Sequence, residues 1–181
     1  YNDAMVQPAA FDLVLDHSDY DFRLFGTPNM PVDHADYLLG LQASALIRDG
    51  GTLQIGIGCL SDAIVHFCRL RQRQNALYQQ ILADFGILER YGDLIEGVGG
   101  IEPFEQGLYG ASEMFVNGFL HLYRDGILKR KVYDSIPLQR LLNEGVIGES
   151  VDERTLRVFL ERGVIPARLT EADVGFLRRF G

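Results

Sequence analysis

The chain has 181 residues, the length of one domain or at most two. Its 17 Lys and Arg against 25 Asp and Glu give a net charge of −8, so we expect no nucleic-acid partner, although basic clusters can still occur locally. A hydrophobic fraction of 47% and a charged fraction of 23% are typical of a globular protein and exclude a disordered chain.

The first 50 residues are expected to contain an extended segment and then a helix. Prolines punctuate residues 1–32, where residues 11–15 alternate like a short strand. Asp33 is a candidate N-cap, and apolar residues at helical spacing follow it until Gly50 and Gly51.

A short strand, a glycine turn and a long helix are predicted next. Residues 52–57 resemble a buried strand that runs into Gly56 and Gly58. Ser61 is the candidate N-cap of a helix that we expect to continue to Phe85 and to end at Gly86.

The second half is predicted to be a loop followed by helices. Residues 92–110 hold six glycines and predict a long loop, a feature that is often functional. Gly126, Gly145 and Gly163 each precede two apolar residues, the pattern of a helix C-cap, and Thr170 with Asp173 forms a near capping box. Residues 135–181 are therefore predicted to be all-helical.

The composition limits the metal and disulfide chemistry that can be expected and indicates a cellular compartment. Two cysteines nine residues apart match neither a disulfide framework nor a zinc site, and four scattered histidines favour no metal. No apolar run approaches the ~18 residues of a membrane span, and residues 1–4 lack the basic start of a secretory leader. We therefore expect a cytoplasmic protein with no membrane partner.

Two motifs are candidates for a functional site. In the first, Gly56-Ile57-Gly58-Cys59 opens a helix after a strand, so its backbone N–H groups suit an anion. It lacks the third glycine and the acidic residue of a dinucleotide fingerprint, which disfavours an oxidoreductase; a tight turn without a ligand is the alternative. In the second, Glu113 precedes a helix, where its carboxylate is either a nucleophile or base or a partner of the helix dipole.

Taken together, Thr52-Leu53-Gln54-Ile55-Gly56-Ile57-Gly58 with Ser61-Asp62-Ala63-Ile64, followed by Ser112-Glu113-Met114-Phe115 and Asn117-Gly118, resemble the acetyl-CoA hydrolase/transferase family. This family includes acetate and 4-hydroxybutyrate CoA-transferases. The resemblance spans residues 33–128. Ser61, Ala111 and Asn117 stand where the family usually has Pro, His and Asp.

The resemblance implies an α/β fold with an open, largely parallel sheet flanked by helices in residues 1–133. The helical pattern of residues 134–181 lies outside the resemblance and predicts a helical insertion or appendage. The resemblance also implies an acyl-CoA:carboxylate CoA-transferase or an acyl-CoA hydrolase in which Glu113 forms a glutamyl-CoA thioester. Oxyanion and CoA-binding roles fall to Gly56, Ile57, Gly58 and Cys59, with Ser112, Asn117 and Gly118 in support.

The same resemblance sets the expected partners. These are an acyl-CoA substrate, a small carboxylate and the rest of a parent chain, with a homodimer left open and no covalently bound cofactor. The family's N-terminal half and its later CoA-binding stretch are not found here, so we expect a domain fragment that folds but is inactive by itself. The alternative is a non-catalytic α/β binding or interaction domain, which would tolerate Gln in place of Glu113.

Overall fold

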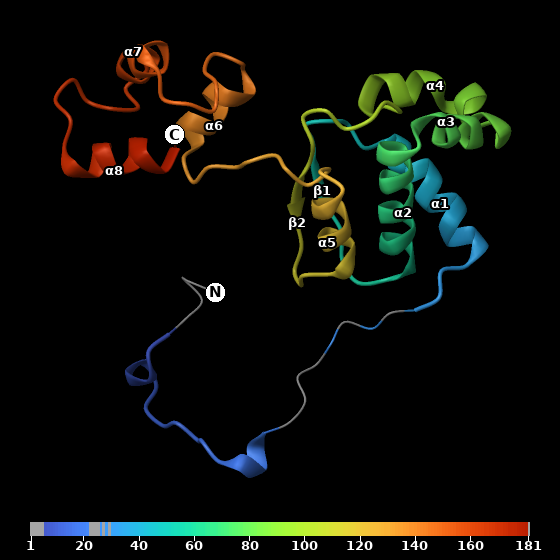
Figure 1. Cartoon of the computed structure of the whole chain (residues 1–181), viewed down its shortest axis with the longest axis horizontal. Helices are drawn as coiled ribbons and strands as arrows, with labels where there is room; N and C mark the ends of the chain where they lie inside the picture. The colour runs from blue at the N-terminus through green and yellow to red at the C-terminus, as the bar shows by residue number, and fades with distance from the viewer. Residues whose placement is uncertain (1–5, 22–25, 27, 29, 181) are drawn as a thin grey trace.

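The computed structural model describes residues 6–21, 26, 28 and 30–180. Two strands, β1 (Thr52–Gln54) and β2 (Tyr109–Ala111), are joined through three helices (Figure 1). The remaining elements, in chain order, are the 3₁₀ turns η2 (Pro8–Ala10) and η3 (Ser18–Tyr20) and the helices α1 (His34–Ala45), α2 (Cys59–Arg73), α3 (Asn75–Asp84), α4 (Ile87–Val98), α5 (Asn117–Arg124), α6 (Ile136–Asn143), α7 (Glu153–Glu161) and α8 (Glu171–Phe180). Within the described ranges, no helix is long and apolar enough to span a bilayer.

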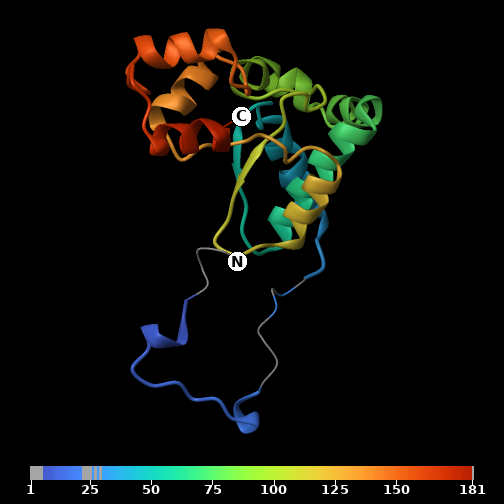
Figure 2. The same cartoon turned by 60° about the vertical axis from the view of Figure 1, so that its left-hand side comes forward.

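The two strands pair in parallel. Thr52 lies opposite Tyr109 and Gln54 opposite Ala111, and helices α2, α3 and α4 form the crossover between the strands. Leu53 is buried while its neighbours on β1 are exposed, because helices α2 and α5 cover one face of the pair (Figure 2). The predicted α/β class and parallel pairing are confirmed. The predicted open sheet with helices on both faces is seen only in part, since the described residues form two short strands covered on one side.

Two apolar cores hold this part of the molecule together. One joins the strands to α2 and α5, with Phe104, Leu108 and Leu122 at its centre. The other lies among α1, α2, α3 and α4 and contains Tyr78 and Leu82, both fully buried.

The buried Arg71 of α2 connects the two cores. Only 1% of the residue is exposed, and its guanidinium donates hydrogen bonds to the carbonyl oxygens of Ser44 (3.3 Å), Ile47 (2.7 Å) and Glu102 (2.6 Å). It also lies 4.1 Å from the centre of the Phe104 ring. Arg71 thereby fastens the end of α1 and the loop between α4 and β2 to the middle of the fold.

The central helices differ from the prediction in two places. The helix expected from Ser61 to Phe85 starts earlier, at Cys59, and breaks at Gln74, whose φ of −139° and ψ of 57° are not helical. The first part of the predicted loop at 92–110, residues 92–98, belongs to helix α4, because Ile87 and Ile95 are buried in the second core. Their burial outweighs the low helix propensity of the glycines in this segment.

The C-terminal segment has an apolar core of its own. Helices α6, α7 and α8 enclose Leu138, Leu141, Phe159 and Phe180, and the segment stands beside the sheet in Figure 1. The predicted all-helical character of this segment is confirmed.

The three predicted C-cap glycines and the capping box at Thr170 are confirmed, whereas the predicted N-cap Ser61 is wrong, because Gly58 caps α2 and Ser61 lies inside its first turn. The three C-cap glycines have φ near +67°, and the residue after each donates back into the preceding helix, as Val164 N does to Phe159 O at 2.8 Å. At the start of α8, Thr170 N donates to an Asp173 carboxylate oxygen at 2.7 Å, and Asp173 N donates to Thr170 Oγ1.

The strand predicted at residues 11–15 is wrong. Among the described residues this segment has no strand partner, and Phe11, Leu13 and Leu15 are 56%, 76% and 72% exposed. Alternation of apolar residues makes a strand only where a neighbouring strand takes up the backbone hydrogen bonds. Parts of the predicted extended segment, residues 1–5, 22–25, 27 and 29, lie outside the described residues.

Candidate functional site

The two sequence motifs leave the sheet at the same edge. β1 and β2 are parallel neighbours, and the backbone N–H of Ile55 donates to Ala111 O at 3.3 Å. Because Gln54 pairs with Ala111, Gly56 and Glu113 each stand two residues beyond a paired position. Neighbouring strands lie about 4.8 Å apart, so the backbone exits of the two motifs are adjacent. In such sheets, the carboxyl ends of the strands are where ligands bind.

The first motif forms the turn that starts α2. Gly58 is the N-cap of the helix and has a φ of +138°, which a residue with a Cβ rarely adopts. Asp62 N donates to Gly58 O at 3.2 Å, so the preceding N–H groups of the first turn point out of the helix end. Asp62 itself lies in this first turn, where its carboxylate interacts favourably with the helix dipole.

The second motif forms an exposed loop between β2 and α5. The hydroxyl of Ser112 donates to Met114 O at 2.5 Å, which closes a tight turn around Glu113. Glu113 is exposed, as are Met114 and Phe115. Ser112 therefore acts here as a shaping residue, and the carboxylate that it flanks is open to solvent.

A small notch brings parts of both motifs together. It measures about 20 Å³, and its lining residues are Pro28, Gly56, Ile57, Gly58, Asp62, Val116 and Asn117. Asn117 therefore lies beside the glycine turn. Glu113, Ser112 and Gly118 do not line the notch, and it has room for about one water molecule.

Gly118 has a packing role that explains a glycine at this position. A Cβ there would lie 2.7 Å from Val65 Cγ2 and 3.3 Å from Ile55 Cδ1. Its absence lets α5 approach both β1 and α2 closely. The start of α5, and with it the loop that carries Glu113, is thus held against the first motif.

The two cysteines differ in their surroundings. Burial raises the pKa of the Cys68 thiol to about 12, so this side chain stays protonated in the core. Cys59 is partly exposed at the glycine turn, and its thiol donates to Pro31 O at 3.4 Å. In the part of the chain that the structure describes, no group of three or more His, Cys, Asp or Glu is arranged to hold a metal ion.

Asp62 is a lining residue that the sequence analysis left out of the site. Its place in the first helical turn was visible in the sequence, but the notch that it shares with Asn117 depends on the pairing of distant strands.

Comparisons of the chain with protein-family models, with curated proteins and with solved structures found no match.

Proposed function

We propose that this chain is the part of an acyl-CoA:carboxylate CoA-transferase, or of an acyl-CoA hydrolase, that carries the nucleophile Glu113. The observation that carries the proposal is the strand register, which sets Gly56 and Glu113 equally far beyond paired positions of adjacent parallel strands. The backbone at Glu113 and the glycine turn thus leave the sheet side by side, which supports the proposal.

The chemistry follows from the carboxylate. An oxygen of Glu113 attacks the thioester carbonyl of an acyl-CoA, the C–S bond breaks, and an acyl-glutamyl anhydride and the CoA thiolate result. The thiolate then attacks the glutamyl carbonyl of the anhydride, which releases the acyl group as its carboxylate and leaves a glutamyl-CoA thioester. A second carboxylate reverses both steps and leaves as the new acyl-CoA. Where water attacks the glutamyl-CoA instead, the outcome is hydrolysis.

The glycine turn has the groups that this chemistry needs. Each tetrahedral state carries a negative oxygen, and the outward N–H groups at the start of α2 are donors of the kind that stabilise one. Loss of one such donor typically costs about 2.7–4 kcal/mol of transition-state stabilisation. The donors lie on the backbone of Gly58 and Cys59, so side-chain substitutions at the turn act through its conformation.

The described residues provide only part of a CoA site. The notch of about 20 Å³ is far smaller than the roughly 300–1,000 Å³ of pockets that enclose a small ligand. The remainder of the site is assigned to further residues of a parent chain or to a second copy.

Trapping of the intermediate tests the proposal. The full-length gene product that carries this chain is incubated with acetyl-CoA and borohydride, and the peptide containing Glu113 is examined by mass spectrometry. We expect reduction of the Glu113 carboxyl to an alcohol, because borohydride reduces an activated glutamyl carbonyl, as in the thioester or the anhydride, but not a free carboxylate. We also expect the variant Glu113→Gln to lose both this product and CoA transfer.

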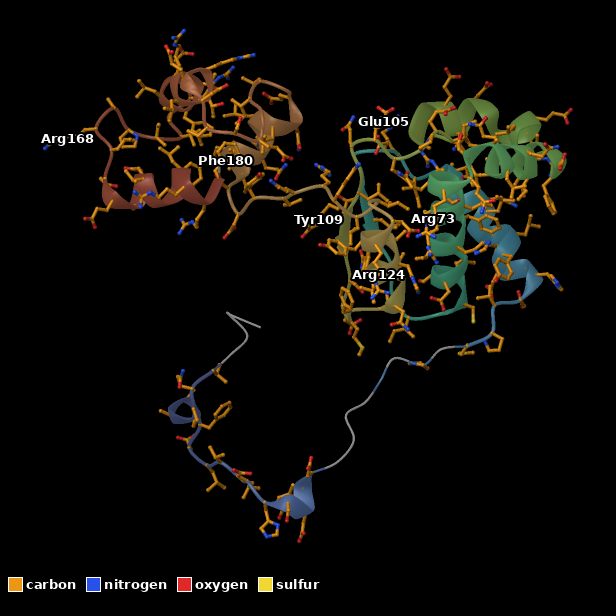
Figure 3. All side chains as sticks on the ribbon, viewed as in Figure 1. Arg73, Glu105, Tyr109, Arg124, Arg168 and Phe180 are labelled. Atoms are coloured by element: carbon orange, nitrogen blue, oxygen red, sulfur yellow. The ribbon has the colours of Figure 1, made fainter. Side chains whose placement is uncertain are left out.

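Glu105→Gln is the matched control, because Glu105 is another exposed loop glutamate before β2 (Figure 3). Circular dichroism of both variants checks that they fold. Unchanged transfer or hydrolysis by the Glu113→Gln protein would refute the proposal. A protein that shows no reduction of Glu113 and no turnover would leave the non-catalytic binding domain as the better description.

A further inference from the structure

A second and larger hollow lies at the other end of the strands. A cleft of about 500 Å³ opens where the segment that follows α5 meets the C-terminal helices. Its polar lining includes Gln106, Gln139 and Asn143 together with the tripeptide Lys129-Arg130-Lys131, and Glu149 stands at its edge. Gly50, two residues before β1, also lines it, whereas Gly56 follows β1 by two residues. At about 3.3 Å per residue, roughly 20 Å separates this cleft from the glycine turn.

Three of the chain's 17 Lys and Arg residues line this cleft. The chain contains only two lysines, Lys129 and Lys131, and both line this one cleft on either side of Arg130. Three cations therefore face a single carboxylate, that of Glu149, on a protein whose net charge is −8. Elsewhere the basic residues are arginines. A local positive region on an acidic protein concentrates small anions.

Several of the lining groups are already held in place. An Arg130 Nη2–H donates to Asn143 Oδ1 at 3.1 Å, and Lys131 Nζ lies 3.3 Å from a Glu149 carboxylate oxygen. Gln139 also donates to Asn143 Oδ1, so the Nδ2 group of Asn143 is the atom left to donate to a ligand. The stem of Lys129 packs against Gly107, which has no side chain to push it away. These contacts place Arg130, Lys131 and Asn143 at the cleft, and the exposed pair of Lys131 with Glu149 is weak enough for a ligand to replace.

We propose that this cleft binds a small phosphate-bearing ligand. Ammonium and guanidinium groups with an amide donor form the set that recognises phosphate oxygens through charge-assisted hydrogen bonds. A volume of about 500 Å³ suits a small molecule rather than a macromolecular surface. The bound anion would replace the Glu149 carboxylate as the partner of the Lys131 ammonium group. This proposal does not rest on the chemistry of Glu113.

Lysine footprinting tests the proposal, because the amines that the reagent can acetylate in this chain are those of two lysines and the α-amino group. The protein is acetylated briefly with an N-hydroxysuccinimide ester, with and without pyrophosphate, and each site is quantified by mass spectrometry. We expect pyrophosphate to slow acetylation of Lys129 and Lys131 several-fold and to leave the α-amino group unchanged. Sodium chloride of equal ionic strength controls for general screening.

Substitutions that are expected to change the pyrophosphate affinity in opposite directions provide a second test. Lys129→Gln and Lys131→Gln should each weaken pyrophosphate binding about tenfold in calorimetry, as loss of a charge-assisted contact predicts. Glu149→Gln should strengthen binding, because it removes the competing carboxylate. Arg168→Gln is the control, since Arg168 is exposed at the outer edge of the C-terminal segment (Figure 3).

The source of the phosphate is distinguished by adding separate arms with inorganic phosphate and with adenosine 3′,5′-bisphosphate. Tighter binding of the bisphosphate assigns the cleft to a nucleotide portion, and equal or weaker binding assigns it to a simple phosphate compound. Equal protection by chloride, or binding that none of the lysine and glutamate variants changes, overturns the proposal.

Discussion

Replacing Arg71 by methionine removes a buried guanidinium that holds three carbonyl groups together. Its hydrogen bonds to Ser44, Ile47 and Glu102 are charge-assisted and contribute about 1.5–3 kcal/mol each, and a desolvated contact with an aromatic ring adds about 2 kcal/mol. The substitution also removes the desolvation penalty of the buried ion, which is several kcal/mol. That penalty is visible in the pKa of Arg71, which burial lowers from its ordinary value.

The net loss of unfolding free energy is expected to be about 3–5 kcal/mol, because three carbonyl groups each lose a donor at a cost of about 1–3 kcal/mol while the desolvation penalty of the ion is regained. For a chain of this length each kcal/mol lowers Tm by about 2–4 °C, so Tm should fall by about 6–20 °C. Arg71→Lys keeps the charge but not the planar fork, so we expect an intermediate loss.

Urea unfolding followed by circular dichroism and tyrosine fluorescence measures the effect of Arg71→Met. The chain has eight tyrosines and no tryptophan, and buried Tyr78 hydrogen-bonds to Ser44 beside the guanidinium. Arg168→Met, at an exposed position, should change the free energy of unfolding by less than about 0.5 kcal/mol. A loss below about 1 kcal/mol for Arg71→Met would show that the three carbonyls find other partners, and the reasoning would fail.

Three further predictions concern pH, packing and activity. Burial alone would raise the pKa of Asp49. Four backbone N–H groups outweigh the effect of burial and hold the pKa of this carboxyl below its ordinary value of 3.8; they belong to Gln106, Gly107, Glu105 and Gly50. A depressed pKa stabilises the fold above the unfolded value of about 3.9 and ceases to do so as pH falls through the folded value. Asp49→Asn should therefore lower the urea midpoint of unfolding at pH 7, and the gap between the midpoints of the variant and the unmodified protein should shrink below about pH 4. A gap that stays constant with pH would contradict this prediction. Gly118→Ala should destabilise the fold by about 1–3 kcal/mol, because the added methyl group overpacks the contact with Val65. Gly92→Ala, in helix α4 with nothing within 4 Å of its Cβ, should stabilise the fold by about 0.5–1 kcal/mol. Equal shifts in Tm for the two variants would rule out the packing argument. The 181-residue chain alone should not turn over acetyl-CoA in a thiol-release assay, and turnover like that of the full-length protein would mean that the site is complete.

Local signals in the sequence predicted the ends of several helices. Asp33 caps α1 through a 2.8 Å bond from Asp36 N, and the three C-cap glycines adopt the left-handed conformation. Each of these signals depends on atoms a few residues apart, so the sequence alone specifies it. The extent of α4 was missed because the glycines within it were given more weight than the spacing of Ile87 and Ile95, whose burial depends on α1 and α3.

The candidate site could be predicted only in part for the same reason. The order of the two motifs indicated that they belong together, and the parallel register agrees with adjacent exits from the sheet. The exposure of Glu113 and the size of the notch depend on side chains from distant segments. The basic cleft was missed entirely, although one signal was present: both lysines of the chain stand within three residues of each other.

The pairing of β1 with β2 has a consequence for how the chain folds during synthesis. Thr52 and Tyr109 are partners, yet they lie 57 positions apart in the sequence (109 − 52). At about 5–20 residues per second, a ribosome takes about 3–11 s to add that stretch, and β2, with which β1 pairs, is not yet made during this time. The helices of the crossover have short-range contacts and form sooner, as do the three C-terminal helices once they are made. The sheet is then the slow step, and slowing translation across the crossover would lengthen the exposure of Leu53 and Ile55, which are buried only in the finished fold.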